Sequence, residues 1–170
     1  MNEVLGGNFL SRINMDLRET KGWSYGARSS VDLLEDRSSL LLIAPVQADK
    51  TGPTVQALLS HVRDLVAEKG VTPAELRQVV TANTRQLAGQ FETSAAVLGA
   101  LRSNALYKRP DDYWERVAER YRAMTAPQLD AAARAMIDPG KIVWIVVGDA
   151  ARVRPQLEGL GLEVEAERVE

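Results

Sequence analysis

Residues 5–26 read LGGNFLSRINMDLRETKGWSYG, and this stretch of the 170-residue sequence decides how its first third folds. Apolar side chains recur in it every four residues, at Leu5, Phe9, Ile13 and Leu17. That spacing is typical of a helix with one apolar face. We therefore predict a helix over residues 2–19 that ends at Gly22, with Gly6 and Gly7 allowing a close approach to a sheet.

The opposite side of this predicted helix is polar. Ser11, Asn14 and Arg18 fall together there when the sequence is wound at 3.6 residues per turn.

Two strands are predicted directly after this stretch. Residues 24–34 alternate between the two faces of a strand, with Tyr25, Val31 and Leu33 on the same face. Residues 38–48 contain the continuous apolar run LLLIAPV, which is typical of a strand covered on both faces. The short turn at residues 35–37 favours an antiparallel hairpin.

Helices dominate the remainder. Helical periodicity covers residues 51–69, 94–107, 111–124, 126–137 and 151–160, and Thr72-Pro73-Ala74-Glu75 is a capping box that starts a helix reaching residue 91. Residues 141–148, KIVWIVVG, have the β-branched content of a buried strand. The order predicts one α+β domain over residues 1–170, with helices packed on a small, largely antiparallel sheet and a loose tail at 163–170.

Composition excludes several classes of protein. Hydrophobic residues make up 45% and charged residues 26%, as in globular domains. A net charge of −2 provides no basic field for nucleic acid. There is no cysteine, so disulfides and thiolate chemistry are excluded. The apolar helical pattern begins within four residues of Met1, from which we expect the sequence to start inside a larger protein.

Self-contained catalytic chemistry is also missing. The sequence has one histidine, His61, and no HxxEH motif, whereas a catalytic zinc usually takes three protein ligands. We expect His61 to be a half-exposed surface residue and this chain to hold no metal. The serines lack a GxSxG elbow, and Gly6-Gly7 lacks the preceding strand of a phosphate loop.

LGGNFLSRI followed by LRETKGWSYG resembles the signature of the C-terminal-half "inactive" domain of M16 (insulinase/pitrilysin-like) metallopeptidases, roughly LGG-x-x-x-SRL and LRE-x-x-G-x-x-Y. The Thr-Pro-Ala-Glu-Leu helix start and the Val-Val-Gly-Asp end of the last strand agree with it. The resemblance implies a LuxS/MPP-like metallohydrolase half-domain that lacks the family's first strand or strands. It is most similar to the tandem M16 proteins of Gram-negative bacteria, which implies a periplasmic or cell-envelope location.

The resemblance also implies a function. In this family two halves close over an extended peptide, and the half with HxxEH binds zinc. The other half contributes an arginine and a tyrosine seven residues apart, a spacing that Arg18 and Tyr25 share. By resemblance, Tyr25 hydrogen-bonds the scissile carbonyl or its oxyanion, and Arg18 binds substrate. This chain alone is then inactive, with zinc in its partner half on the same or a separate chain.

Other interpretations remain open at this stage. Arg18 could simply be solvated on the polar side of its helix, and Tyr25 could be a core aromatic, because it shares a face with Val31 and Leu33. The whole chain could be a non-enzymatic M16-fold structural or protein-binding module, or an unrelated α+β binding domain. Missing family strands would leave an exposed sheet edge, from which we expect homodimers.

Overall fold

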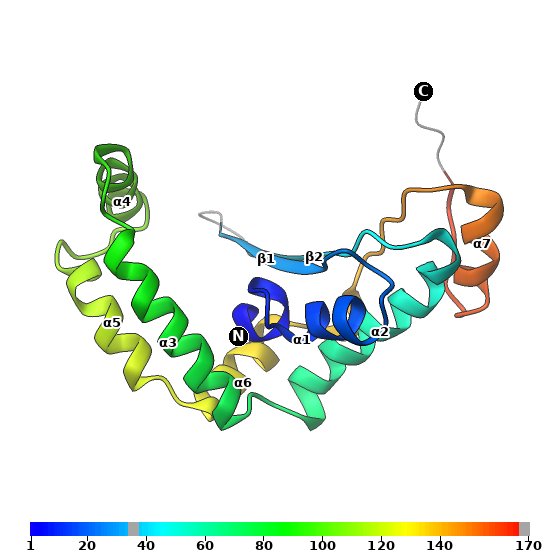
Figure 1. Cartoon of the computed structure of the whole chain (residues 1–170), viewed down its shortest axis with the longest axis horizontal. Coiled ribbons are helices and arrows are strands. Elements are labelled where there is room, and N and C mark those ends of the chain that lie inside the picture. The colour runs from blue at the N-terminus through cyan, green and yellow to red at the C-terminus, as the bar shows by residue number, and fades with distance from the viewer. Residues whose placement is uncertain (34–37, 167–170) are drawn as a thin grey trace.

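The computed structural model describes residues 1–33 and 38–166. Within these ranges the main elements are the helical turns η1 (Glu3–Gly7), η2 (Met15–Thr20) and η4 (Asp64–Glu68), the strands β1 (Arg28–Leu33) and β2 (Ser38–Ile43), and the helices α1 (Arg12–Asn14), α2 (Thr51–Arg63), α3 (Pro73–Gly89), α4 (Ser94–Leu106), α5 (Tyr113–Ala123), α6 (Ala126–Met136) and α7 (Ala150–Glu158). Figure 1 shows the hairpin lying over α1 and α2, with α3 to α5 at one end of an elongated molecule and α7 at the other. The predicted α+β fold class is confirmed.

The hairpin has the predicted antiparallel arrangement. Its register runs from the pair Arg28–Ile43 to the pair Leu33–Ser38, and an isolated bridge joins Ser24 to Val46. Both strands are shorter than predicted. The predicted turn at residues 35–37 lies outside the described residues.

The prediction of one continuous helix over residues 2–19 is wrong. The backbone leaves the helical conformation at Asn8, where φ is −137° and ψ is 172°. The Asn8 side chain stabilises the break: its Nδ2 donates to the Glu3 carbonyl at 2.8 Å, and its Oδ1 accepts from the Leu10 N–H at 2.9 Å. An asparagine side chain thereby replaces helical hydrogen bonds with local ones. Phe9 is consequently exposed, although its spacing placed it on the apolar stripe.

The main core lies between this N-terminal segment and α2. Its fully buried members include Leu5, Ile13, Leu17, Val62 and Leu65. Gly6 permits the close packing expected of it, because a Cβ there would lie 2.5 Å from Ile13 Cδ1 and 2.6 Å from the backbone nitrogen of Ser29. At Gly7 a Cβ would meet the side chains of Glu3 and Asn2 instead.

The downstream helices form where the sequence predicts them. The capping box of α3 is complete, since Thr72 Oγ1 accepts from the Glu75 N–H and Glu75 Oε2 accepts from the Thr72 N–H. α6 begins in the same way, with Thr125 and Gln128 as the capping pair. Among the described residues, no helix has both the length and the apolar character to cross a membrane.

The predicted strand over residues 141–148 is wrong. Residues 142–147 have no regular secondary structure, and the sheet of the described residues has two strands, β1 and β2. Val143, Ile145 and Val147 are 84%, 87% and 91% exposed. A β-branched sequence becomes a strand only when a neighbour satisfies its backbone groups, and no described strand lies beside this one.

The apolar run of β2 is likewise not covered on both faces, as its sequence had indicated. Leu40 and Leu42 pack against the core, whereas Leu41 points away from it and is exposed. The sheet therefore has one covered and one open face, as antiparallel sheets commonly do.

Candidate functional site

Arg18 and Tyr25 lie together on the surface. The Arg18 guanidinium carbon is 5.1 Å from the centroid of the Tyr25 ring and 4.7 Å from that of Phe9. Tyr25 is 90% exposed and belongs to no strand, so it is not a core aromatic. Nor is Arg18 freely solvated, because it contacts two rings and its Nε lies 3.1 Å from Glu19 Oε1. The structure thus brings together the two residues that the sequence singled out, while their roles stay predictions.

The turn that carries Tyr25 is anchored on both sides. Gly22 adopts a φ of +63°, a left-handed conformation that favours glycine and ends η2. The N–H groups of Trp23 and Ser24 then donate to the Leu17 carbonyl at 2.9 and 3.3 Å. Ser24 Oγ donates to the Pro45 carbonyl at 2.7 Å and accepts from the Gly26 N–H at 3.1 Å. Tyr25 is therefore an exposed side chain on a fixed backbone.

Asn14 connects this turn to the segment that carries Phe9. Its Nδ2 donates to the Phe9 carbonyl at 2.7 Å, and its Oδ1 accepts from the Ala27 N–H at 3.0 Å. Ser11 and Asn14, which the sequence places on the polar side of the predicted helix, are both buried. Sequence reasoning missed the role of Asn14. The available signal was its position four residues before Arg18, on the same side of the helix.

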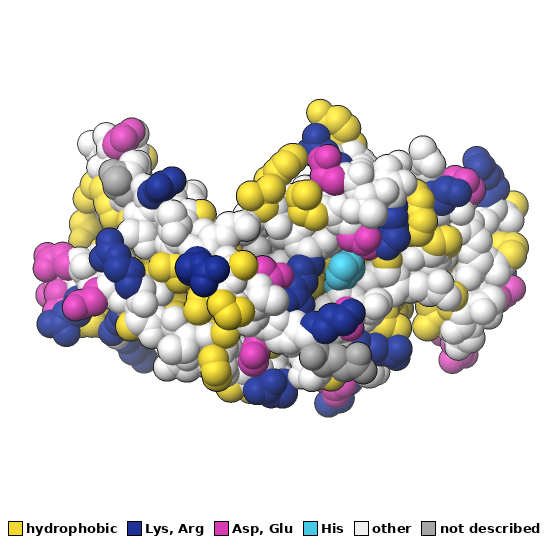
Figure 2. Space-filling model, turned by 60° about the horizontal axis from the view of Figure 1, so that its bottom comes forward, with side chains coloured by type: hydrophobic (Ala, Val, Ile, Leu, Met, Phe, Trp, Pro, Cys, Tyr) yellow, Lys and Arg dark blue, Asp and Glu magenta, His cyan; other side chains and the backbone are white. Residues whose placement is uncertain are grey.

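His61 belongs to a small ionic network. Its Nε2 lies 3.0 Å from Asp16 Oδ2, which also accepts a hydrogen bond from Lys21 Nζ. Partial burial raises the pKa of Asp16, but the hydrogen bonds from Lys21 and His61 outweigh it and lower the pKa below its usual value. In Figure 2 the single histidine lies among basic and acidic side chains on one face of the molecule.

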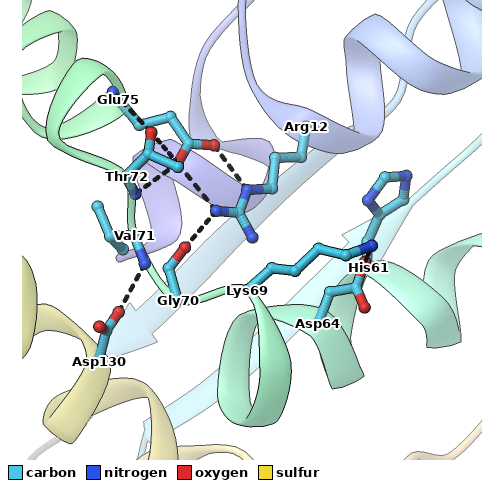
Figure 3. Close-up of a pocket in the computed structure, with 9 residues that line it drawn as sticks. All are labelled: Arg12, His61, Asp64, Lys69, Gly70, Val71, Thr72, Glu75 and Asp130. Atoms are coloured by element: carbon cyan, nitrogen blue, oxygen red, sulfur yellow. Dashed lines mark hydrogen bonds and ion pairs between the residues drawn. The ribbon is translucent and has the colours of Figure 1, made fainter.

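A pocket of about 580 Å³ lies beside His61, between α2 and the start of α3 (Figure 3). Its lining consists of Arg12, His61, Asp64, Lys69, Gly70, Val71, Thr72, Glu75 and Asp130, a set that contains neither Arg18 nor Tyr25. The charged groups bond to one another or to the backbone. Arg12 binds Glu75 and the Gly70 carbonyl, and Asp130 accepts from the Val71 N–H at 2.7 Å. These contacts fix the α2–α3 connection against α1 and α6.

The described residues do not fit a zinc ion. They contain no group of three or more histidine, cysteine, aspartate or glutamate side chains placed to hold a metal. The ring nitrogen Nε2 of His61 is already engaged with Asp16. No catalytic step through a metal can therefore be derived from these residues.

Residues 1–83 match the family model described as the peptidase M16 inactive domain. This part of the chain is similar to the inactive domain of the peptidase M16 family. The matched range contains the Phe9–Arg18–Tyr25 cluster and the α2–α3 connection.

Curated relatives of this chain are named as proteases. An "Uncharacterized zinc protease" of Mycobacterium leprae is 32% identical over 77 residues, which are 45% of this chain and 17% of that protein. One of Mycobacterium tuberculosis is 32% identical over 75 residues, again covering 17% of that protein. The chain thus spans about a sixth of the length of these relatives.

Solved structures extend the similarity beyond the matched range. A peptidase M16 inactive domain from Pseudomonas fluorescens superposes with a TM-score of 0.72 at 25% identity, over 82% of this chain and 33% of that chain. A protease from Helicobacter pylori has the same fold, with a TM-score of 0.64 at 16% identity over 79% of this chain and 32% of that one. Because the superposed part is longer than residues 1–83, the similarity of fold extends past residue 83.

Proposed function

We propose that this chain is the zinc-free half of an M16-type zinc peptidase. It binds an extended peptide and completes the active site of a half that bears HxxEH and zinc. The observation that carries the proposal is the contact between Arg18 and Tyr25, with the Tyr25 ring held at the surface by an anchored turn. A side chain that is 90% exposed on a fixed backbone is available to a second protein half.

The chemistry assigned to Tyr25 follows from its exposed phenol. The hydroxyl donates a hydrogen bond to the scissile carbonyl and continues to do so as charge develops on that oxygen. Such a preorganised donor typically lowers the activation free energy by about 3 kcal/mol when it acts in an enclosed site. Exclusion of water requires the second half, because Tyr25 is open to solvent in this chain.

Arg18 acts beside it as the group that binds substrate. Its guanidinium remains charged at any working pH and offers several N–H donors to peptide carbonyls or to a carboxylate. Contact with the Phe9 and Tyr25 rings limits its rotamers, so less conformational entropy is lost when a peptide binds.

The proposal holds whether the partner half lies on the same polypeptide or on another. In either case residues 1–170 act as one domain, including the charged segment that follows α7. We also propose that the isolated chain self-associates through residues 142–147, because three of their apolar side chains are almost fully exposed and their backbone lacks a described strand partner.

The test mixes this chain with the candidate zinc-bearing half and follows cleavage of a quenched fluorescent peptide. Each half alone and a mixture with chelator serve as controls. Activity only in the complete mixture, and its loss in Tyr25→Phe, is the expected result. Association of the halves without cleavage would overturn the proposal and favour a structural or peptide-binding module.

A further inference from the structure

Phe9 is the third member of the Arg18–Tyr25 cluster, although its spacing placed it on the apolar helix face and the family signature leaves its position unspecified. The Arg18 guanidinium carbon is closer to the Phe9 ring, at 4.7 Å, than to the Tyr25 ring, at 5.1 Å. A guanidinium within about 6 Å of a ring centroid is attracted by the electrons of the ring face. Phe9 therefore contributes to the position of Arg18.

The same ring is also available to a ligand. Phe9 is 55% exposed and the adjacent Leu10 is 56% exposed, and Tyr25, which contacts the same guanidinium as Phe9, is 90% exposed. The Asn8 turn prevents residues 9 and 10 from joining the helix and directs them out of the core. Apolar side chains held at the surface beside a polar anchor are typical of the pockets that recognise peptide side chains.

The backbone around Phe9 is tied to the backbone around Tyr25. Asn14, which is buried, donates to the Phe9 carbonyl and accepts from the Ala27 N–H. The two backbone segments are thus joined through one side chain, and Arg18 lies one helical turn beyond it. This arrangement exists before any peptide binds, which is a requirement for a specificity site.

We propose that Phe9 and Leu10 form an apolar subsite that receives a bulky apolar side chain flanking the scissile bond, and that Phe9 also positions Arg18. This inference rests on the proposed function, since it names a preference of the same peptide site. An extended peptide whose carbonyl reaches Tyr25 places a neighbouring side chain against the adjoining Phe9–Leu10 surface.

The positioning role is tested on the chain alone, by the NMR signal of the Arg18 Nε–H group. Ring currents displace this signal in the wild-type chain. Phe9→Ala moves it to the position of a solvated arginine, because the guanidinium then also leaves the Tyr25 ring, whereas Phe9→Tyr retains the displacement. Leu98→Ala, which removes an exposed apolar side chain from α4, is the matched control and leaves it in place. An unmoved signal in Phe9→Ala overturns the positioning role.

The subsite is tested with two peptides that differ only by leucine or serine beside the cleaved bond. With the zinc-bearing half present, Phe9→Ala lowers kcat/KM for both peptides through the displaced Arg18, and it lowers that of the leucine peptide by about tenfold more than that of the serine peptide, mainly through KM. Phe9→Tyr restores the preference. Equal losses on both peptides overturn the subsite and leave the proposed function intact.

A failure of the proposed function gives a different result. The wild-type mixture then cleaves neither peptide, and the two peptides are titrated onto the chain alone while the Arg18 and Leu10 signals are followed. Stronger perturbation by the leucine peptide, lost in Phe9→Ala, supports the subsite as a binding site. Equal perturbation by both peptides, or none, overturns it.

Discussion

Arg12 and Glu75, 63 residues apart in the sequence, are joined by two charge-assisted hydrogen bonds: Nε to Oε1 at 2.6 Å and Nη2 to Oε2 at 2.8 Å. The same Oε2 accepts from the Thr72 N–H, so one carboxylate both caps α3 and ties it to α1 (Figure 3). Bidentate arginine–carboxylate pairs of this kind are stronger than ordinary surface ion pairs.

Because of this ion pair, we predict that the stability of the fold depends on pH in the acid range. Partial burial raises the pKa of Glu75, but hydrogen bonds from Arg12 and Thr72 outweigh it and lower the pKa from 4.5 to about 2. The carboxylate therefore stabilises the fold fully above about pH 4.5, and its contribution is lost as the pH falls through about 2.

We expect Glu75→Gln to lower the unfolding free energy at pH 7 by about 1–2 kcal/mol, after allowance for solvent screening. The unfolding free energy of this variant should also depend less on pH between about 4.5 and 2, the acid limb of the pH profile. Urea unfolding at several pH values measures both effects. Glu119→Gln, on the exposed side of α5, is the control and leaves the acid limb unchanged. Identical pH profiles for wild type and Glu75→Gln would contradict the assignment.

Gly6 and Gly99 provide a matched pair of glycine substitutions. Gly6→Ala places a methyl group against Ile13 and the Ser29 backbone, and we expect it to lower the unfolding free energy by about 2–3 kcal/mol. Gly99→Ala meets no atom within 4 Å inside α4, and we expect a gain of about 0.5–1 kcal/mol from helix propensity. Thermal denaturation compares the two. If Gly6→Ala left the unfolding free energy unchanged, the N-terminal turn would pack less closely against Ile13 and Ser29 than the structure shows.

Asn14→Ala removes both hydrogen bonds that connect the Phe9 and Tyr25 segments. Because this leaves a carbonyl and an N–H group without their buried partner, we expect a loss of about 2 kcal/mol. Asn83→Ala loses one bond within α3, to the Val79 carbonyl, and should cost less than about 1 kcal/mol. Equal losses in the two variants, measured by urea unfolding, would argue against a connecting role for Asn14.

Tyr25→Phe should lower kcat in the mixture of halves by a factor on the order of 10²–10³, with KM nearly unchanged, because the donor acts mainly in the transition state. Arg18→Lys should instead raise KM, since an ammonium cannot reproduce the planar donors of the guanidinium. Steady-state kinetics separates the two. A rise in KM alone for Tyr25→Phe would reassign it to substrate binding.

Because residues 142–147 expose several apolar side chains, we predict that isolated chains associate with one another. We expect light scattering to show mass that rises with concentration, and Ile145→Lys to shift the population toward monomer while leaving the unfolding free energy within about 0.5 kcal/mol. A wild-type chain that stays monomeric at high concentration would contradict this expectation.

Local patterns in the sequence determined most of the secondary structure. The helices α2 to α7 form where periodicity and capping residues placed them, because Thr72 with Glu75 or Thr125 with Gln128 needs only neighbours three residues away. The proximity of Arg18 and Tyr25 also followed from the sequence, through a motif of eight residues.

The tertiary structure alone decided the features that depend on residues distant in the sequence, namely burial, exposure and strand pairing. It exposed Phe9 at the Asn8 turn, buried Asn14 between two segments, and placed no described strand beside residues 142–147. Helical propensity and caps are local, so the sequence states them directly. Burial and strand pairing depend on which surfaces meet, and a one-dimensional pattern does not contain that information.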